Sequence, residues 1–400
     1  MVWRWRAARF ITLGLAVVVG VFVLSAASSG ETAKVEQSVE LVAFAQPDQP
    51  EHDGINDVVL DVATPAGNGT FQITGWAVET DEVEVLADGV RVGTLRIDQE
   101  RVDVAIANGL RGAFVGFDGR VDIPSDTFLI CVTRPGQLPG PDACNRETLE
   151  LPRQRVVAFY GVPGTPALGT LGSGSASQVR RRLLRQAEPY ERADRHVLPA
   201  FEILGTVAQA SAGQDGDYSG PTSQALIRDY LDEIRKVEGI VVIDIQPGRD
   251  EFMDQLPEFE QLLREPDVHV ALDPEWRLRA GELPNQVVGH VGAGEVNAVI
   301  DYLDGIVHEF RLPPKLLIVH NFQPQMIRNR PDIEPTPSVD LLVHMDGHGP
   351  PATKTGNYTR LVSLQQAAAG FKLFYKRDVP LMSPSDVFDM DPNVDFVSYQ

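Results

Sequence analysis

The feature that most constrains this chain is an alternation of β-type and helical runs over residues 153–400. Eight short apolar runs have the composition of buried strands: 155–161, 196–204, 239–245, 268–273, 315–321, 339–346, 370–375 and 394–400. Amphipathic stretches with apolar residues at three- and four-residue spacing lie between several of them, as in the stretch that Ser223 caps and Gly239 follows. This rhythm predicts a (β/α)8 barrel, a fold of about 250 residues.

An open, doubly wound α/β sheet is the alternative architecture for such an alternation. The number of strand candidates favours the barrel. The glycine-containing segment 169–177, "GTLGSGSAS", has no G-x-G-x-x-G spacing, so a nucleotide-binding loop is not predicted. We therefore expect no cofactor.

Residues 56–152 have a different texture, made of short alternating runs such as "TFQITGWAVE" and "DEVEVLADGVRVGTLRI". Asp-Gly and Asn-Gly pairs punctuate these runs, and "RVDVAIA" is taken as one more strand. Short strands at this spacing predict an antiparallel β-sandwich. The fold class is therefore an all-β sandwich followed by a barrel.

The first 55 residues predict export. Three arginines (Arg4, Arg6, Arg9) precede a long apolar run and a small-residue exit, so 1–29 is interpreted as a signal peptide or signal anchor. Residues 30–55 are small and polar and are interpreted as a linker. The only cysteines are Cys131 and Cys144, and in an exported chain such a pair predicts a disulfide. We expect a secreted or cell-surface protein.

The order of motifs in the first region resembles a β-sandwich module of secreted actinobacterial proteins. The residues that carry this resemblance are Gly75-Trp76-Ala77, Asp88-Gly89, Val92-Gly93, Arg101 to Ala105, Gly116-Phe117, Cys131 and Cys144. The resemblance covers roughly residues 70–150 and implies an accessory role beside a catalytic or surface domain. From the residues themselves, Trp76 is a core aromatic and Asp88-Gly89 a hairpin turn.

The charge balance excludes some partners. The formal net charge is −21, with 56 acidic against 35 basic side chains. A nucleic-acid-binding protein needs a basic surface, so no nucleic-acid partner is expected. The same balance excludes a basic membrane-surface module, which leaves the N-terminal segment as the only expected membrane contact. The sequence does not indicate an oligomeric state.

Polar side chains gather where the predicted barrel strands end, and this end of a barrel carries the active site. The residues are Tyr160, Glu202, Asp244, Gln246, Asp273, Glu275, His320, Asn321, His344, Asp346, His348, Tyr375 and Lys376. A purely structural barrel has no need of polar residues at nearly every strand exit. Asp244 alone is equally well explained as a loop cap. Glu202 lies inside an apolar run, so it either faces water or is functional.

Asp273 and Glu275 form the most suggestive pair. At i and i+2 on an extended chain their carboxylates point to the same side, and Pro274 stiffens the backbone between them. Trp276 supplies an apolar wall of the kind that raises a carboxyl pKa. A turn with two solvated acids is the structural alternative.

Aromatic residues beside carboxylates are typical of a sugar-binding site, and glycoside hydrolysis needs two carboxyl groups across the bond. Through strand-end acids such as "VIDIQ" and "LDPEW", the second region broadly resembles (β/α)8-barrel glycoside hydrolases of secreted bacterial proteins. No defined family is matched. We predict Glu275 as the general acid, with Asp244 or Asp346 as its partner. Asp244 is expected within several ångströms, whereas Asp346 is expected across the rim at a larger separation.

The remaining side chains are assigned to binding a glycan or cell-wall polysaccharide: Tyr160, Glu202, Asp273, Trp276, His320, Asn321, His348 and Tyr375. Two alternatives stay open. In the first, His344, Asp346 and His348 alternate on one face and hold zinc together with His320, giving a deacetylase or amidohydrolase-like enzyme. In the second, the same rim binds glycans without catalysis.

Overall fold

The computed structural model describes residues 58–400, except 111, 126, 128, 146–148, 150, 152, 193–194 and 365–366. The predicted export segment and linker lie outside the described residues. Among the described residues, no helix has both the length and the apolar character needed to cross a bilayer.

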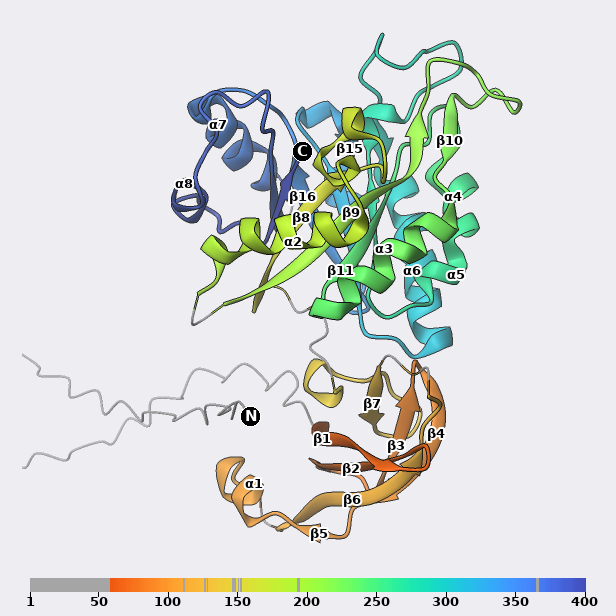
Figure 1. Ribbon diagram of the computed structural model, residues 1–400, viewed down its shortest axis with the longest axis vertical. Coiled ribbons are helices and arrows are strands. Elements are labelled where there is room, and N and C mark those ends of the chain that lie inside the picture. The colour runs from red at the N-terminus through yellow and green to blue at the C-terminus, as the bar shows by residue number, and fades with distance from the viewer. Residues whose placement is uncertain are drawn as a thin grey trace, which may run out of the picture. The chain divides into compact units, whose positions relative to one another are not determined.

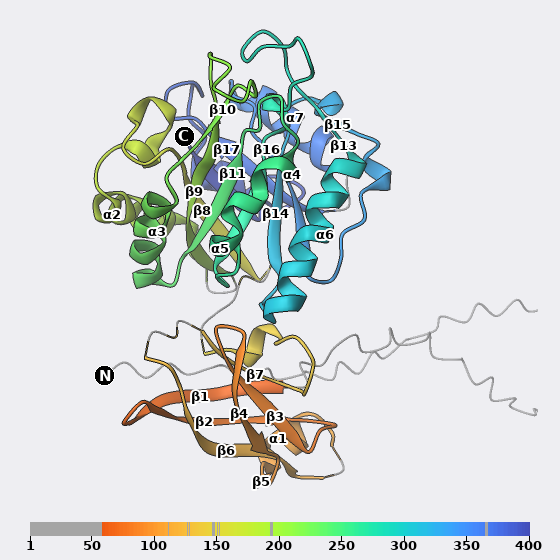
Figure 2. The same ribbon diagram turned by 90° about the vertical axis from the view of Figure 1, so that its right-hand side faces the viewer.

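Residues 154–399 form a closed barrel of eight parallel strands (Figures 1 and 2). In order around the barrel they are β8 (Gln154–Gly161), β9 (His196–Ala208), β11 (Ile240–Ile245), β12 (Val268–Leu272), β14 (Lys315–His320), β16 (Val339–Met345), β17 (Ala368–Leu373) and β18 (Phe396–Tyr399). β18 pairs in parallel with β8 and closes the ring. The sequence prediction of eight barrel strands is confirmed, with strand ends displaced by a few residues.

Helices cover the outside of the barrel in both ribbon views. They are α2 (Ala176–Ala187), α3 (Gln224–Ile234), α4 (Phe252–Gln255), α5 (Glu260–Leu263), α6 (Ala293–Phe310), α7 (Pro351–Val362) and α8 (Pro384–Phe388). α3 is the amphipathic stretch between Ser223 and Gly239 that the sequence predicts. Between β14 and β16 the described residues form, instead of an α-helix, the 3-10 turns η8 (Pro324–Met326) and η9 (Arg330–Asp332) around the short strand β15 (Ile327–Arg328).

Shorter elements complete the connections. These are β10 (Ser219–Pro221), which pairs antiparallel with β9; β13 (Val291–Gly292), which pairs with β15; and the 3-10 turns η1 (Pro141–Ala143), η2 (Pro166–Leu168), η3 (Thr170–Gly172), η4 (Glu188–Tyr190), η5 (Arg235–Val237), η6 (Leu256–Phe259) and η7 (Pro274–Trp276).

Strand alternation divides the barrel interior into two layers. The lower layer is a buried apolar cluster of Val156, Ala158, Leu198, Ala200, Ile240, Val242, Ala271, Leu316, Ile318, Leu342 and Phe396. Because successive side chains point to opposite faces, positions spaced by two share the interior. Continuing each strand by that spacing gives the upper layer: Tyr160, Glu202, Asp244, Asp273, His320, His344, Lys372 and Ser398, all buried. The interior therefore changes from apolar to polar toward the carboxyl ends of the strands.

Residues 58–144 form two antiparallel sheets. One has the order β1 (Val58–Gly67), β2 (Thr70–Ala77), β6 (Phe114–Asp122), β5 (Gln99–Glu100), and the other β4 (Val90–Arg96), β3 (Glu82–Ala87), β7 (Ile130–Thr133). Buried apolar residues of both sheets join one cluster. Asp88 and Gly89 both have positive φ, at 44° and 81°, as the predicted hairpin turn requires. The disulfide Cys131–Cys144 is present, which confirms the pairing.

One predicted strand of this region is wrong. Residues Val102–Ala107, from "RVDVAIA", form the helix α1. Neighbouring Val104 and Ala105 are both buried while Val102 and Ile106, four apart, are exposed, a pattern that fits a helix and not a strand. Asp103 in the first turn also favours the helix through its dipole.

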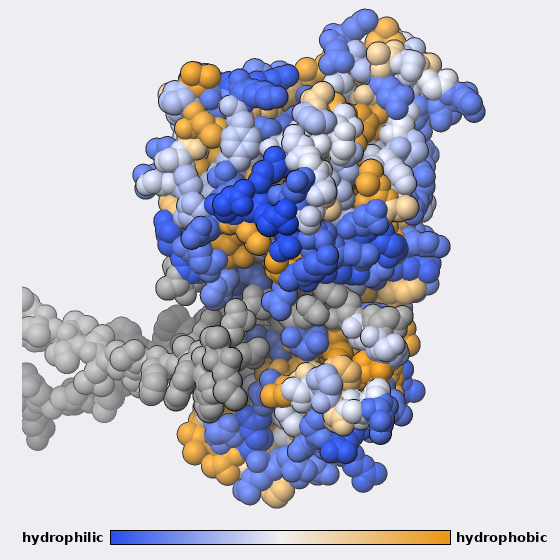
Figure 3. All heavy atoms as spheres, in the orientation of Figure 1, coloured by the Kyte–Doolittle hydropathy of each residue, from blue (hydrophilic) through white to orange (hydrophobic). Residues whose placement is uncertain are grey.

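The described surface is largely polar in the view of Figure 3, where apolar side chains are scattered in small groups among hydrophilic ones. The exposed large apolar side chains include Val90 on β4, Ile106 on α1 and Phe114 on β6, which lie on different elements. Their separation agrees with an ordinary hydrophilic protein surface.

Candidate active site at the carboxyl ends of the barrel strands

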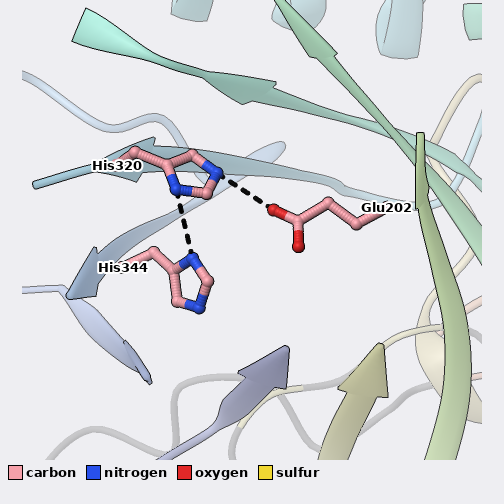
Figure 4. Close-up of side chains that lie close together, drawn as sticks. All are labelled: Glu202, His320 and His344. Atoms are coloured by element: carbon pink, nitrogen blue, oxygen red, sulfur yellow. Dashed lines mark hydrogen bonds and ion pairs between the residues drawn. The ribbon is translucent and has the colours of Figure 1, made fainter. Parts of the chain in front are cut away.

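The upper layer of the barrel is organised around His320, the last residue of β14. Its Nε2 lies 2.9 Å from Oε1 of Glu202, which comes from β9. β11 and β12 separate these two strands in the ring, so the interaction crosses the barrel interior (Figure 4). Both side chains are completely buried. Glu202 therefore faces the barrel interior and not water.

The other ring nitrogen of His320 serves Asp346, which follows β16. Nδ1 lies 3.1 Å from Oδ2 of Asp346, and Oδ1 of that carboxylate has no hydrogen-bond partner. Burial raises the pKa of Asp346, but the hydrogen bond and charge of His320 together with Lys372 outweigh burial, so the pKa ends below its ordinary value. Asp346 is thus held ionised with one oxygen unoccupied.

His344 lies beside His320 on the neighbouring strand, with ring centroids 4.8 Å apart (Figure 4). Its Nδ1 is 3.4 Å from Nδ1 of His320, and its Nε2 is 3.3 Å from the hydroxyl of Ser398. Burial, followed by the charge of His320, lowers the pKa of His344 well below its ordinary value. His344 is therefore a neutral imidazole in the layer.

Asp273 and Glu275 are brought together, though not on an extended chain as predicted. Asp273 is the N-cap of the 3-10 turn η7, and Pro274 is the first residue of the turn, because the fixed φ of proline suits the start of a helical turn. Burial, then the charge of Glu275, raises the pKa of Asp273 well above its ordinary value. Burial, then the charge of Asp346, raises the pKa of Glu275 to about 7. Both carboxyl groups thus resist ionisation.

Three carboxyl groups converge at one point. Asp273, Glu275 and Asp346 each place an oxygen within 4.8 Å of the others. The expectation that Asp346 lies across the rim at a larger separation is therefore wrong, because only β14 separates β12 from β16 in the ring. Glu275 is partly exposed, whereas Asp273 and Asp346 are 1% and 8% exposed. The trio lies at the boundary between the barrel interior and solvent.

Asp244, the other predicted partner carboxylate, sits deeper. It is fully buried on β11, 3.6 Å from Nε2 of His320, and neither of its oxygens has a hydrogen-bond partner. Burial raises the pKa of Asp244 to about 6, against the opposing charge of His320. Its position adds an acidic neighbour to His320 and places the group below the converging trio.

Two members of the layer, Lys372 and Ser398, were missed in the sequence, whereas Gln246 is among the polar residues named there at the strand ends. Lys372 on β17 lies with its ammonium 3.2 Å from the ring centre of Tyr160, a cation–π contact. Gln246 donates to Asp273 at 3.0 Å and to the Tyr160 hydroxyl at 3.3 Å. Ser398 contacts His344. A signal existed, since Lys372 stands inside an apolar strand as Glu202 does.

The remaining predicted residues are divided between the site and its surroundings. Asn321 is fully buried with both amide atoms unpartnered, and the indole nitrogen of Trp276 is also unpartnered. His348 packs instead on Phe374, with ring centroids 5.9 Å apart, because β16 has ended before it. Tyr375 stacks on Tyr399, and its hydroxyl donates to Gln186 of α2. The contacts of His348 and Tyr375 thus lead away from the carboxylate trio.

Among the residues that the structure describes, two sets have donor atoms close enough for a metal: Glu202, His320 and His344, and the trio Asp273, Glu275 and Asp346. The first set fits poorly, since both nitrogens of His320 already face carboxylates and a metal ligand must be an unprotonated nitrogen. The predicted fourth ligand, His348, lies outside it. The second set offers only oxygen, which suits a hard cation such as Mg²⁺ or Ca²⁺ rather than zinc.

Hydrogen bonds and ion pairs hold the loop that carries Glu275 in place. Arg277, 3% exposed, donates to Glu295 at 2.8 Å and Glu251 at 3.0 Å. The carbonyl oxygen of Glu275 accepts from the backbone N–H of Gly289 at 2.7 Å. A Cβ at Gly289 would lie 2.4 Å from the carbonyl oxygen of Arg277, so the loop closes on itself only with glycine there. β13 then pairs with β15 and ties this loop to the next.

Comparison with known proteins assigns the chain to no family. No known family matches the chain, and no curated protein is similar to it. Among similar solved structures is the GH20 β-N-acetylhexosaminidase of Streptomyces coelicolor A3(2), with 10% identity and a TM-score of 0.27. The match covers 58% of this chain and 51% of the enzyme, about half its length. A TM-score this low says nothing about substrate.

Proposed function

We propose that the barrel is a glycoside hydrolase, with Glu275 as general acid and Asp346 as nucleophile. The observation that carries this proposal is the pairing of two neighbouring carboxyl groups with opposite protonation tendencies. Glu275 has a pKa of about 7, whereas the pKa of Asp346 is below its ordinary value, and their oxygens lie within 4.8 Å. Two carboxyl groups pushed apart in pKa are typical of an acid and its partner.

The short separation favours retention of anomeric configuration. Retaining enzymes have carboxyl groups about 5–5.5 Å apart, whereas inverting enzymes leave room for a water at about 6.5–9.5 Å. In the first step Glu275 gives its proton to the glycosidic oxygen while the unpartnered Oδ1 of Asp346 attacks the anomeric carbon, and the alcohol leaves. In the second step Glu275, now ionised, takes a proton from water, which displaces Asp346 and restores both groups.

The surrounding side chains suit a sugar in this position. Asp273, kept protonated by its burial, has an unpartnered Oδ1 that can bond a hydroxyl group. Asn321 has an unpartnered amide oxygen and nitrogen, and Trp276 an unpartnered N–H. Buried polar atoms without partners are rare in proteins, so a hydroxyl-rich substrate would satisfy an otherwise unfavourable arrangement.

The test uses hydrolysis of cell-wall and exopolysaccharide fragments by wild type and Glu275→Gln. Losing general acid catalysis is expected to lower kcat/KM by about 10²–10⁴-fold. The wild-type rate should fall as pH rises above about 7, because Glu275 must carry a proton to act. NMR of the released sugar should show the starting anomer first. Undiminished hydrolysis by Glu275→Gln would refute the assignment of the acid.

Asp244→Asn is the matched comparison for Asp346→Asn, since both remove a buried carboxylate of this layer. Asp346→Asn is expected to lower turnover far more, because Asp244 has no contact with the outer trio among its described hydrogen bonds and ion pairs. If Asp244→Asn is the more damaging change, Asp244 and not Asp346 is the partner carboxylate.

A metal-dependent hydrolase is the second candidate, favoured by the close oxygens of Asp273, Glu275 and Asp346. Activity that vanishes with chelator and returns with a divalent cation would replace the first proposal. Binding of glycans without hydrolysis under any condition would support the non-catalytic alternative.

We further propose that residues 1–29 direct export, that the two antiparallel sheets pack as a β-sandwich, and that this module accompanies the barrel to a wall or extracellular glycan. Support comes from the signal-like N-terminus, the shared apolar cluster of the two sheets and the disulfide. Fractionation of the native cells tests the location, and N-terminal sequencing of the recovered protein shows whether the segment is cleaved.

A further inference from the structure

We propose that His320 is a positioning residue whose ring permanently carries two protons. Glu202 stabilises this charged ring from across the barrel. The ring in turn keeps the carboxylate of Asp346 ionised and fixes its orientation. Its catalytic meaning rests on the proposed function, whereas its charge state is a property of the protein alone. No reacting atom is assigned to His320.

The charge follows from the hydrogen bonds. A neutral imidazole has one N–H and one lone pair, so it can donate to one side only. His320 faces the carboxylate of Glu202 at 2.9 Å on one side and that of Asp346 at 3.1 Å on the other, and ionised carboxylates only accept. A neutral ring would turn its lone pair toward one of them. Two protons on the ring satisfy both contacts.

His344 fits this assignment independently. Its Nδ1 is 3.4 Å from the same Nδ1 of His320 that faces Asp346, so the His320 proton points toward a second acceptor. His344 must then keep its own proton on Nε2, where the Ser398 hydroxyl lies at 3.3 Å. One charged and one neutral ring fill the pair, which avoids two positive rings with centroids 4.8 Å apart.

The groups that face His320 come from every part of the layer. They are Glu202 on β9, Asp244 on β11, Asp273 and Glu275 after β12, His344 and Asp346 on and after β16, Lys372 on β17, and Tyr160 on β8, whose ring meets His320 edge-on. Three of these groups, Glu202, Asp244 and Asp346, have carboxylate oxygens within 3.6 Å of the ring nitrogens of His320, so a positive ring is favoured there although burial opposes it.

The role of Glu202 follows from the ring nitrogen of His320 that it contacts. It contacts His320 at the side away from Asp346, and its Oε2 has no partner. A buried cation without a matched anion is strongly unfavourable. Glu202 therefore supplies the counter-charge, and His320 carries its effect to Asp346. This arrangement fixes Oδ2 of Asp346 and leaves Oδ1 open.

The first test needs no substrate and no variant. The full-length protein is labelled with ¹⁵N-histidine, and its ring nitrogens are followed by NMR to pH 8. One ring is expected to keep both protons at pH 8, where an ordinary imidazole is neutral. Absence of any such ring in the folded wild type would overturn the proposal.

Variants then assign the signal. His320→Gln should remove it, and Glu202→Gln should shift its loss of a proton to below pH 8. His196→Gln is the matched control, because His196 and Glu191 form an exposed pair at 2.8 Å at the start of β9, the strand that also carries Glu202. The signal should remain in that variant. A doubly protonated ring that persists unchanged in folded Glu202→Gln would show that Glu202 does not stabilise it.

The kinetic test separates positioning from mere structural support. Glu202→Gln is expected to lower kcat about 10²-fold, because His320 loses the counter-charge that keeps its ring positive beside Asp346, with KM changed less than about 3-fold. The acidic limb of the pH profile should move to higher pH, because Asp346 loses the charge that keeps it ionised. Glu202→Asp should restore part of the activity. An unmoved acidic limb in a folded variant would contradict the role.

The two proposals fail separately. If the wild type hydrolyses no glycan but retains the doubly protonated ring, the proposed function is wrong and the charge assignment stands. If glycans are hydrolysed and every histidine is neutral at pH 8, the hydrolase assignment stands and His320 has no such role.

Discussion

The lower and upper halves of the same eight strands differ in chemistry although they share one backbone. Below, the interior is an apolar cluster that includes Ile318 and Leu342. Two residues further along the same strands stand His320 and His344, surrounded by buried carboxyl groups. Apolar burial stabilises the fold, whereas buried ionisable groups oppose it unless they are paired. The barrel thus has an apolar interior at one end and an interior of buried ionisable groups at the other.

The largest expected effect on this comparison comes from the lower layer. Ile318 is fully buried, and Ile318→Ala should lower the free energy of unfolding by about 2–5 kcal/mol through lost burial and the cavity left behind. Turnover per folded molecule should change little. Urea unfolding and active-site titration measure the two quantities. A variant that keeps its stability but loses turnover would show that the layers are not separate.

Reduction of the disulfide, which lies outside the barrel, is the comparison for the substitution at Ile318. Reducing Cys131–Cys144, which are 13 residues apart in sequence, should destabilise the two-sheet region by about 3 kcal/mol in the chain-entropy account. Glycan hydrolysis should be unaffected if the barrel carries the activity. The check is calorimetry of the oxidised and reduced protein with a parallel assay. Loss of hydrolysis on reduction alone would connect the two regions.

The smallest effect concerns pH and the upper layer. Glu275 has a pKa of about 7 in the folded protein against an ordinary 4.5, so the folded state binds more protons than the unfolded one between these values. Stability should therefore fall as pH rises from about 4.5 to 7, by about 1–3 kcal/mol. Asp244 acts in the same direction between 3.8 and about 6. Glu275→Gln should flatten the curve, and an equally steep curve would remove Glu275 as the cause.

The sequence was sufficient to predict the barrel, because the alternation of strand-like and helical runs and the lengths of these runs are apparent in short stretches of residues. It also indicated Glu202, whose charge interrupts an apolar strand. Lys372 and Ser398 interrupt their strands in the same way and were overlooked, although this signal was available. The helix α1 was missed because a six-residue apolar run fits either period until its burial is known.

The geometry of the site could not be obtained in this way. Glu202 and His320 are 118 residues apart, and only closure of the ring brings them to 2.9 Å. The 3-10 turn η7 and the order of the strands in the ring bring Glu275 and Asp346 together, and neither is apparent in the sequence, so a larger separation of the carboxyl groups was expected. Protonation states follow from these contacts and are not visible in residue order.

The contacts that hold the Glu275 loop in place limit which mutations could change the specificity of the proposed site. Arg277 anchors it to two acidic residues, Gly289 permits no side chain, and β13 joins it to β15. Replacing the whole loop would break all three connections at once and displace Glu275. Under the proposed function, laboratory evolution toward another glycan should therefore succeed through single changes at positions around the trio, with Arg277 and Gly289 left unchanged.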